Sequence, residues 1–182
     1  MSLSSKEAAE SLSDVERAAR RSAQAFGYSK AAPHLIMWGA IWVVGYSGTD
    51  LSPMNANWIW GPLILAGCIG GYLLGRGSCR TNSRGAWRVF ALAAVALVFI
   101  FSTYTIMWPV YGPQLAAFPA LLTGTVYAGV GLWLGMRYVI TGLAIIALTM
   151  GGYLYLHEHL MLWMAFVGGG GMILAGVWFR AA

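Results

Sequence analysis

The sequence predicts an all-α membrane protein: a polytopic bundle of six transmembrane helices, arranged as three hairpins, behind a short cytosolic N-terminal helix. Of its 182 residues, 59% are hydrophobic and only 9% are charged, whereas an average soluble domain has roughly 25% charged residues. Six long apolar segments follow one another, and the basic residues gather at alternate ends of them. A soluble fold of this size needs more polar surface, and disorder needs low hydrophobicity with high charge, so both classes are excluded.

Residues 4–30 are polar and predict a short cytosolic helix. Ser13 and Glu16 match the Ser-x-x-Glu capping box that begins many helices. Asp14 and Arg17 have the spacing of a helical ion pair. The apolar residues form only a thin stripe, which consists of Leu12, Val15, Ala19 and Phe26. We therefore expect residues 1–32 to be a charged cytosolic segment that rests on the inner leaflet or contacts a cytosolic protein partner, and residues 33–182 to be the membrane domain.

The membrane domain contains six apolar segments of spanning length. A hydrocarbon core about 30 Å thick needs roughly 20 apolar residues in a helix. Continuous apolar runs favour helices over the alternating strands of a membrane barrel. The predicted spans are residues 33 to 46 or 48, 57–75, 87–108, 114–136, 139–156 and 160–179, of which the first is the shortest.

The basic residues predict which side of the membrane each loop faces. If the N-terminus lies inside, the inner segments are residues 1–32, 76–88, 137–138 and 180–182, and they contain all 11 Lys and Arg residues. The outer loops instead carry Asp50 and Glu158. Because Lys and Arg near span ends concentrate in cytoplasmic loops, we expect six spans with the N- and C-termini both in the cytoplasm.

Spaced glycines predict how the helices pack. Lipid provides no hydrophobic force between helices, so small residues that allow close backbone approach must supply the contact. Gly67, Gly71 and Gly75 repeat at intervals of four in the second span, and Gly131 and Gly135 repeat this spacing in the fourth. We expect these residues to pack helices within one chain. The alternatives are a seam between copies in a homo-oligomer and a hinge at the glycine run 168–171.

Side chains that could carry chemistry are scarce inside the spans. Spans two to six contain no Asp, Glu, Lys or His at mid-depth, which argues against proton relays and ion-coupled transport. Span hydroxyls such as Thr141 and Thr149 are expected to bond the preceding turn or a neighbouring helix, and a weakly polar cavity lined by them is the alternative. Trp38 and Trp42 lie four residues apart on one face of the first span and form a possible ligand face.

The last outer loop contains a cluster of potential metal ligands, His157, Glu158 and His159. Two imidazoles at this spacing could bind one metal if the backbone is extended, with Glu158 or Asp50 as a third ligand. A helical backbone would point them apart, and a polar turn between two spans explains the same residues. The sequence carries none of the common motifs of hydrolases, metalloproteases or nucleotide-binding proteins. We therefore expect no enzyme activity, no cofactor and no nucleic-acid partner.

The beginning of the chain resembles a group of small, uncharacterised bacterial membrane proteins. The likeness rests on the Glu/Arg-rich residues 15–21 and on the Trp-Gly-x-x-Trp pattern from Trp38 to Trp42, within residues 32–46. The resemblance implies a six-span protein of a bacterial inner membrane, and it implies no activity, cofactor or catalytic residue. We expect a non-enzymatic regulatory or scaffold component of the lipid bilayer. The alternative is a small permease or binder of an apolar or neutral solute.

Overall fold

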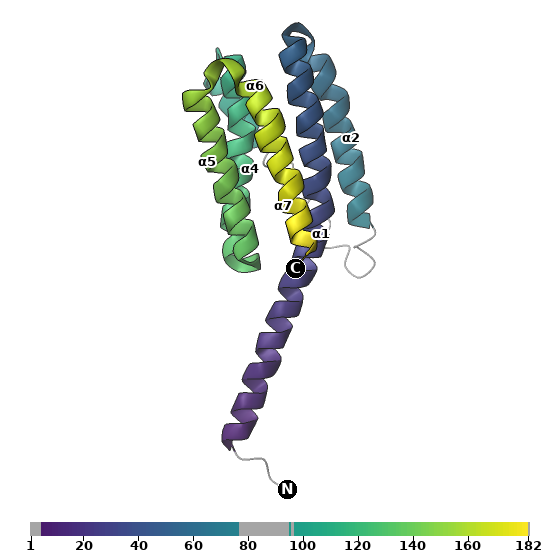
Figure 1. Cartoon of the computed structure of the whole chain (residues 1–182), viewed down its shortest axis with the longest axis vertical. Coiled ribbons are helices and arrows are strands. Elements are labelled where there is room, and N and C mark those ends of the chain that lie inside the picture. The colour runs from purple at the N-terminus through teal and green to yellow at the C-terminus, as the bar shows by residue number, and fades with distance from the viewer. Residues whose placement is uncertain (1–4, 77–94, 96, 182) are drawn as a thin grey trace.

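The computed structural model describes residues 5–76, 95 and 97–181, and over these residues the chain is helical, without strands. The π-helical segment η3 (Met164–Gly169) joins α6 to α7 without a break, so the described residues form six helical rods. This result confirms the predicted all-α class and helix count. The predicted basic loop and the first part of the predicted third span lie outside the described residues. The six rods are α1 (Ser5–Leu51), α2 (Ala56–Arg76), a short apolar helix at Leu97–Ile106, α4 (Gly112–Leu134), α5 (Met136–Tyr155), and α6 (Leu160–Trp163) continued by η3 and α7 (Gly170–Arg180) (Figure 1).

Four stretches among the described residues are long and apolar enough to cross a membrane, which indicates a membrane protein. They are Pro53–Gly75, Gly112–Leu134, Met136–Tyr155 and His157–Arg180. Two of them begin with a short 3-10 helix, namely η1 (Pro53–Asn55) before α2 and η2 (His157–His159) before α6.

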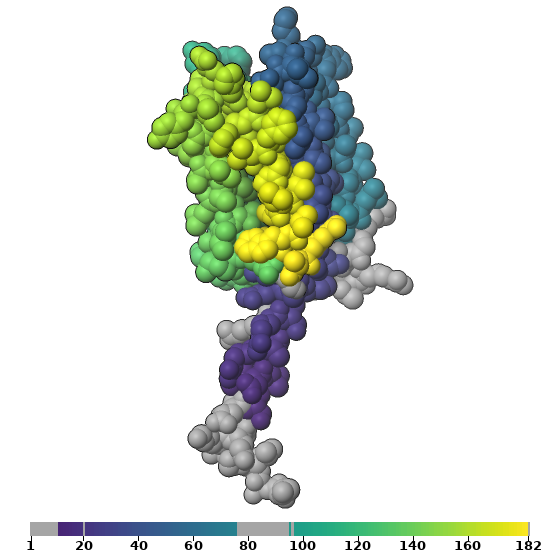
Figure 2. Space-filling view, viewed as in Figure 1, coloured from purple at the N-terminus to yellow at the C-terminus, as the bar shows by residue number. Residues whose placement is uncertain are grey.

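Helix α1 is one continuous helix of 47 residues, and Pro33 lies inside it. The predicted division at residue 32 therefore falls within a helix. At 1.5 Å per residue α1 is about 70 Å long, more than twice the hydrocarbon thickness of a bilayer. Its first half stands clear of the other helices (Figures 1 and 2). Its second half lies at the centre of the bundle, where Ala32 and Leu35 are fully buried.

The second half of α1 packs closely on the C-terminal helix through glycine. A Cβ atom added at Gly39 would lie 2.7 Å from the Gly169 carbonyl oxygen, and one added at Gly176 would lie 2.9 Å from the Ala32 carbonyl oxygen. Because these backbones touch, α1 and η3–α7 form one tight pair. Helix α2 packs on the outer side of α1 (Figure 1).

Helices α4 and α5 form a second tight pair. A Cβ atom at Gly124 would lie 2.8 Å from the Gly142 carbonyl oxygen, and one at Gly131 would lie 2.5 Å from the Val139 nitrogen. The turn between the two helices is made by Gly135, whose φ of 131° is a conformation that other residues rarely adopt.

The two helix pairs meet at both ends of the bundle. Near one end, the Tyr46 hydroxyl of α1 donates a buried hydrogen bond of 2.9 Å to the Ala116 carbonyl of α4. Near the other end, the Tyr138 hydroxyl of α5 donates one of 2.9 Å to the Gly27 carbonyl of α1. Between these ends α5 and α7 diverge. The predicted third hairpin, α5 with α6–α7, therefore encloses a gap between its helices, because α7 packs on α1.

The two ends of the bundle differ in charge. Arg137, at the start of α5, donates a hydrogen bond to the carbonyl of Trp178 near the C-terminus, and its guanidinium lies 5.4 Å from the Tyr28 ring centre. At the opposite end, Asp50 lies in the last turn of α1 and Glu158 lies in η2. The positive-inside argument requires that basic residues lie at one end of the bundle, away from the other.

Candidate functional site

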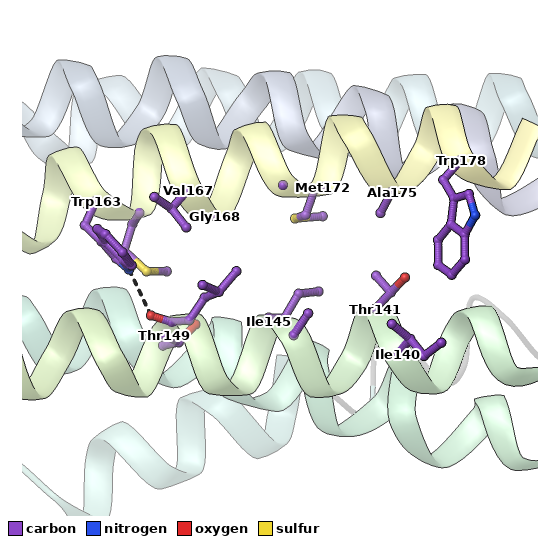
Figure 3. Close-up of a pocket in the computed structure, with 14 residues that line it drawn as sticks. Ile140, Thr141, Ile145, Thr149, Trp163, Val167, Gly168, Met172, Ala175 and Trp178 are labelled. Carbon is purple, nitrogen blue, oxygen red and sulfur yellow. Dashed lines mark hydrogen bonds between the residues drawn. The ribbon is translucent and has the colours of Figure 1, made fainter.

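A cleft of about 170 Å³ lies between α5 and the α6–α7 segment. One wall is α5 from Ile140 to Thr149, and the other is the C-terminal segment from Trp163 to Trp178. Figure 3 shows the labelled side chains of both walls pointing toward each other across the gap. The lining is apolar apart from two threonine hydroxyls and two indole N–H groups.

Small residues explain why this space stays open. The wall formed by η3 and α7 presents Gly168, Gly171 and Ala175, and the α5 wall presents Ala144. A Cβ atom added at Gly171 would have no neighbour within 4 Å. Since a core of ordinary side chains would close such a gap, the cleft results from missing side-chain volume on facing helices.

Two tryptophans hold the walls apart at the ends of the cleft. The Trp163 indole N–H donates a hydrogen bond of 2.8 Å to the Leu148 carbonyl (dashed line in Figure 3). Its ring lies against Gly152, where an added Cβ would collide with the indole. At the other end, the Trp178 ring stacks with the Arg137 guanidinium at 4.9 Å. The width of the cleft is therefore fixed by specific contacts at both ends.

Thr141 is the polar group that distinguishes this cleft. Its side chain is 5% exposed, and its hydroxyl oxygen has no hydrogen-bond partner among the described residues. An unsatisfied buried hydroxyl costs about 1–3 kcal/mol, so it requires an explanation. Other span hydroxyls do bond the preceding turn, as predicted: those of Thr103, Thr105, Thr123 and Thr125 donate to the carbonyl four residues earlier.

Arg137 supplies a fixed positive charge at one end of the cleft. Its side chain bonds the Trp178 carbonyl and lies over the rings of Tyr28 and Trp178, while its backbone N–H donates to the Tyr28 hydroxyl at 3.4 Å. The guanidinium is thus held where α1, α5 and α7 meet. Ile140, less than one turn further along α5, already lines the cleft.

The predicted ligand face of Trp38 and Trp42 is occupied by helix packing. The Trp38 ring lies 2.7 Å from the position of a Cβ at Gly67 of α2. Trp42 is 8% exposed, packs near Gly168 and meets the Tyr46 ring edge-on. Both rings therefore fill contacts between helices, and the cleft lies elsewhere.

The predicted metal cluster lies in a 3-10 helix. His157, Glu158 and His159 form η2 and are exposed. Residues two apart in a helix point in different directions, and the His157 ring instead contacts Tyr153 at 5.4 Å. No group of three or more His, Cys, Asp or Glu side chains that could hold a metal occurs in the described part of the chain.

The predicted packing glycines have different surroundings. Gly67 lies under Trp38, whereas Gly71 has its nearest neighbour, His34, at 3.9 Å from an added Cβ. Gly75 has nothing within 4 Å. Gly131 and Gly135 belong to the tight α4–α5 pair, where a Cβ at Gly135 would also collide with the Tyr28 hydroxyl.

Trp163 lines one end of the cleft and packs on Gly152, and neither residue was predicted as part of a site. Tryptophan commonly anchors a helix at the membrane boundary, and the contact of Trp163 with α5 has no pattern in the sequence. Trp58, Trp108 and Trp133, by contrast, are largely exposed, at 81%, 77% and 81%.

The fold and cleft define a helical membrane protein with an apolar recess between its helices. No protein-family model matches the chain, and neither the curated proteins nor the solved structures contain a match to it.

Proposed function

We propose that the chain is a six-span protein of a bacterial inner membrane, with both termini and the basic end of the bundle in the cytoplasm. Support comes from the four long apolar stretches and from the enclosed second half of α1. The apolar helix Leu97–Ile106 would belong to the remaining span. In this arrangement the first half of α1 projects into the cytoplasm.

We further propose that the protein binds an apolar or weakly polar, membrane-soluble molecule in the α5–α7 cleft. The observation that carries this proposal is an apolar recess with one buried, unpartnered hydroxyl, that of Thr141. A bound molecule with one acceptor group would satisfy that hydroxyl, and its apolar part would fill the space left by Gly171 and Ala175. We assign no reaction to the cleft, because threonine and tryptophan are its only side chains with polar N–H or O–H groups.

A regulatory or scaffold role is the second candidate, and the projecting half of α1 favours it. The described side chains at 11–26 are exposed, apart from the half-buried Ser13. The predicted pair Asp14–Arg17 is present, with a nitrogen–oxygen distance of 3.1 Å. A solvated helix of this kind would suit a cytosolic protein partner. Deleting residues 1–26 should abolish capture of such a partner while leaving ligand binding in the cleft intact.

Filling the cleft tests the binding proposal. Gly171→Leu places a side chain in the recess without a clash at Cβ, and Gly61→Leu makes the same change on α2, where an added Cβ also has no neighbour within 4 Å. We expect purified wild-type protein and Gly61→Leu to retain a phosphatidylcholine molecule in native mass spectrometry, and Gly171→Leu to lose most of it. Equal retention by all three proteins would contradict a binding role for the cleft.

A further inference from the structure

We propose that the molecule bound in the α5–α7 cleft is an anionic phospholipid, with its phosphate on Arg137 and an acyl chain between the helices. This inference rests on the proposed binding role of the cleft and specifies the class of ligand. It follows from three features: a cation without an acidic partner, the order of side chains along α5, and the extent of the apolar wall.

The basic end of the bundle contains no acidic side chain that could pair with Arg137. The chain has six acidic residues, and four of them lie within its first 16 positions. Glu16 is the closest of these to Tyr28 along α1, and at 12 residues it lies about 18 Å away. The other two, Asp50 and Glu158, lie at the opposite end of the bundle. Among the described residues, no acidic side chain therefore serves as a charge complement for Arg137.

The guanidinium of Arg137 is held in a fixed position, but most of its N–H groups have no hydrogen-bond acceptor among the described residues. Of its five N–H donors, one serves the carbonyl of Trp178, and the side chain makes no further hydrogen bond within the described residues. The Tyr28 and Trp178 rings fix its position. A planar guanidinium held in this way suits the bidentate recognition of phosphate oxygens.

The side chains along α5 follow the order of groups in a phospholipid. Thr141 lies four residues beyond Arg137, hence on the same helix face and about 6 Å further on. Ile145 and Leu148 continue the cleft from there. In a phospholipid the phosphate is likewise followed by ester carbonyls and then by acyl chain. With the phosphate at Arg137, an ester carbonyl would accept the proton of the unpartnered Thr141 hydroxyl.

The apolar wall is long enough for an acyl chain. Trp163 and Trp178 are 15 residues apart, or about 22 Å along a helix, whereas one leaflet contributes about 15 Å of hydrocarbon. A zwitterionic headgroup would bring an additional ammonium toward Arg137, at a cost from like-charge repulsion. The charge of the site therefore favours a headgroup with a net negative charge.

Competition between two lipids tests the inference. The full-length protein is purified in detergent and presented with equal amounts of phosphatidylglycerol and phosphatidylcholine that carry the same acyl chains, and the retained lipid is counted by native mass spectrometry. Both lipids carry the phosphate, so the choline ammonium makes the difference, and its repulsion by Arg137 predicts a preference of about tenfold for phosphatidylglycerol. Arg137→Gln should bring this preference close to one, and it should lower the retention of both lipids because each loses its phosphate contact. Arg180→Gln removes the same charge at the same end and should leave the preference intact.

Several outcomes would overturn the inference. The first is that wild type binds the two lipids equally, and the second is that Arg137→Gln keeps the wild-type preference. The third is that Arg137→Gln and Arg180→Gln lose the preference to the same extent, which would indicate an effect of general surface charge. If Arg137→Gln does not fold, Arg137→Lys keeps the charge but not the planar fork, and undiminished retention of phosphatidylglycerol in that variant also counts against the site. The binding proposal is tested separately from the headgroup preference, because Gly171→Leu should reduce retention of both lipids whatever their headgroups.

Discussion

Gly39 and Gly169 face each other across the contact between α1 and the C-terminal segment, so that a Cβ atom on either residue would lie 2.7 Å from the carbonyl oxygen of the other. No real Cβ contact is this short, so both positions require glycine at the present helix separation. This contact draws the C-terminal segment onto α1 and away from α5. The cleft is therefore a consequence of where the glycines close the bundle.

Alanine at Gly39 should destabilise the protein, because a methyl group would push against backbone. Overpacking of this kind costs about 1–3 kcal/mol. Gly170→Ala, next to the contact, adds its Cβ where no atom lies within 4 Å and should be neutral or stabilising, since alanine is the better helix former by about 1 kcal/mol. Thermal unfolding in detergent, followed by tryptophan fluorescence, compares the two variants. A similar unfolding temperature for both variants would mean that α1 and the C-terminal segment can move apart at little cost in free energy.

The Tyr138 hydroxyl holds the projecting half of α1 to the rest of the bundle through the Gly27 carbonyl. Tyr138→Phe removes this hydrogen bond, worth about 1 kcal/mol, and leaves the ring contacts with Tyr28 and Phe179. We expect faster amide hydrogen exchange around residues 27–31 of α1 and faster tryptic cleavage after Lys30. Tyr155→Phe, at an 85% exposed residue, should change neither rate. Unaltered exchange in Tyr138→Phe would show that aromatic packing alone secures α1.

Much of the fold is predictable from the sequence, because apolar length and charge are local properties. Hydrophobic runs locate most of the helices directly, whereas Gly135, which follows the end of α4, was predicted as a packing residue inside the fourth span. The continuity of α1 through Pro33 was not predicted, because a proline after a polar segment resembles a boundary. In the structure the helix continues, and Ala32 and Leu35 on either side of Pro33 are fully buried.

The candidate site is less predictable, because it depends on contacts between distant residues. Thr141 and Thr149 were recognised as hydroxyl groups that could line a cavity, but their sequence does not distinguish them from Thr123, which bonds its own helix. The pairing of α7 with α1 depends on backbone approach at Gly39, Gly169 and Gly176. Glycines with similar spacing at Gly71 and Gly75 make no such contact.

Thr141→Val should affect stability and ligand binding in opposite directions. Valine has nearly the same shape but no hydroxyl, so the variant loses an unsatisfied buried group, and in lipid-depleted detergent it should gain about 1 kcal/mol. Retention of phosphatidylglycerol should fall, because the donor to the ester carbonyl is gone. Thr123→Val removes a satisfied hydroxyl outside the cleft and should neither stabilise the protein nor reduce retention. A lower stability of Thr141→Val without lipid would mean that the hydroxyl has a partner in solution.

The proposed orientation predicts which residues each side of the membrane can label. Cys68 is first replaced by alanine together with Cys79, and single cysteines are then placed at Asp50, Glu158 and Arg180. In intact cells, a membrane-impermeant maleimide should label the variants at positions 50 and 158, because these residues lie at the acidic end of the bundle, and should label position 180 only after the membrane is opened. The physical basis is the preference of Lys and Arg for the cytoplasmic side. Labelling of position 180 from outside would contradict a cytoplasmic C-terminus. Labelling of positions 50 and 158 from opposite sides would require an odd number of crossings between them and would overturn the six-span arrangement.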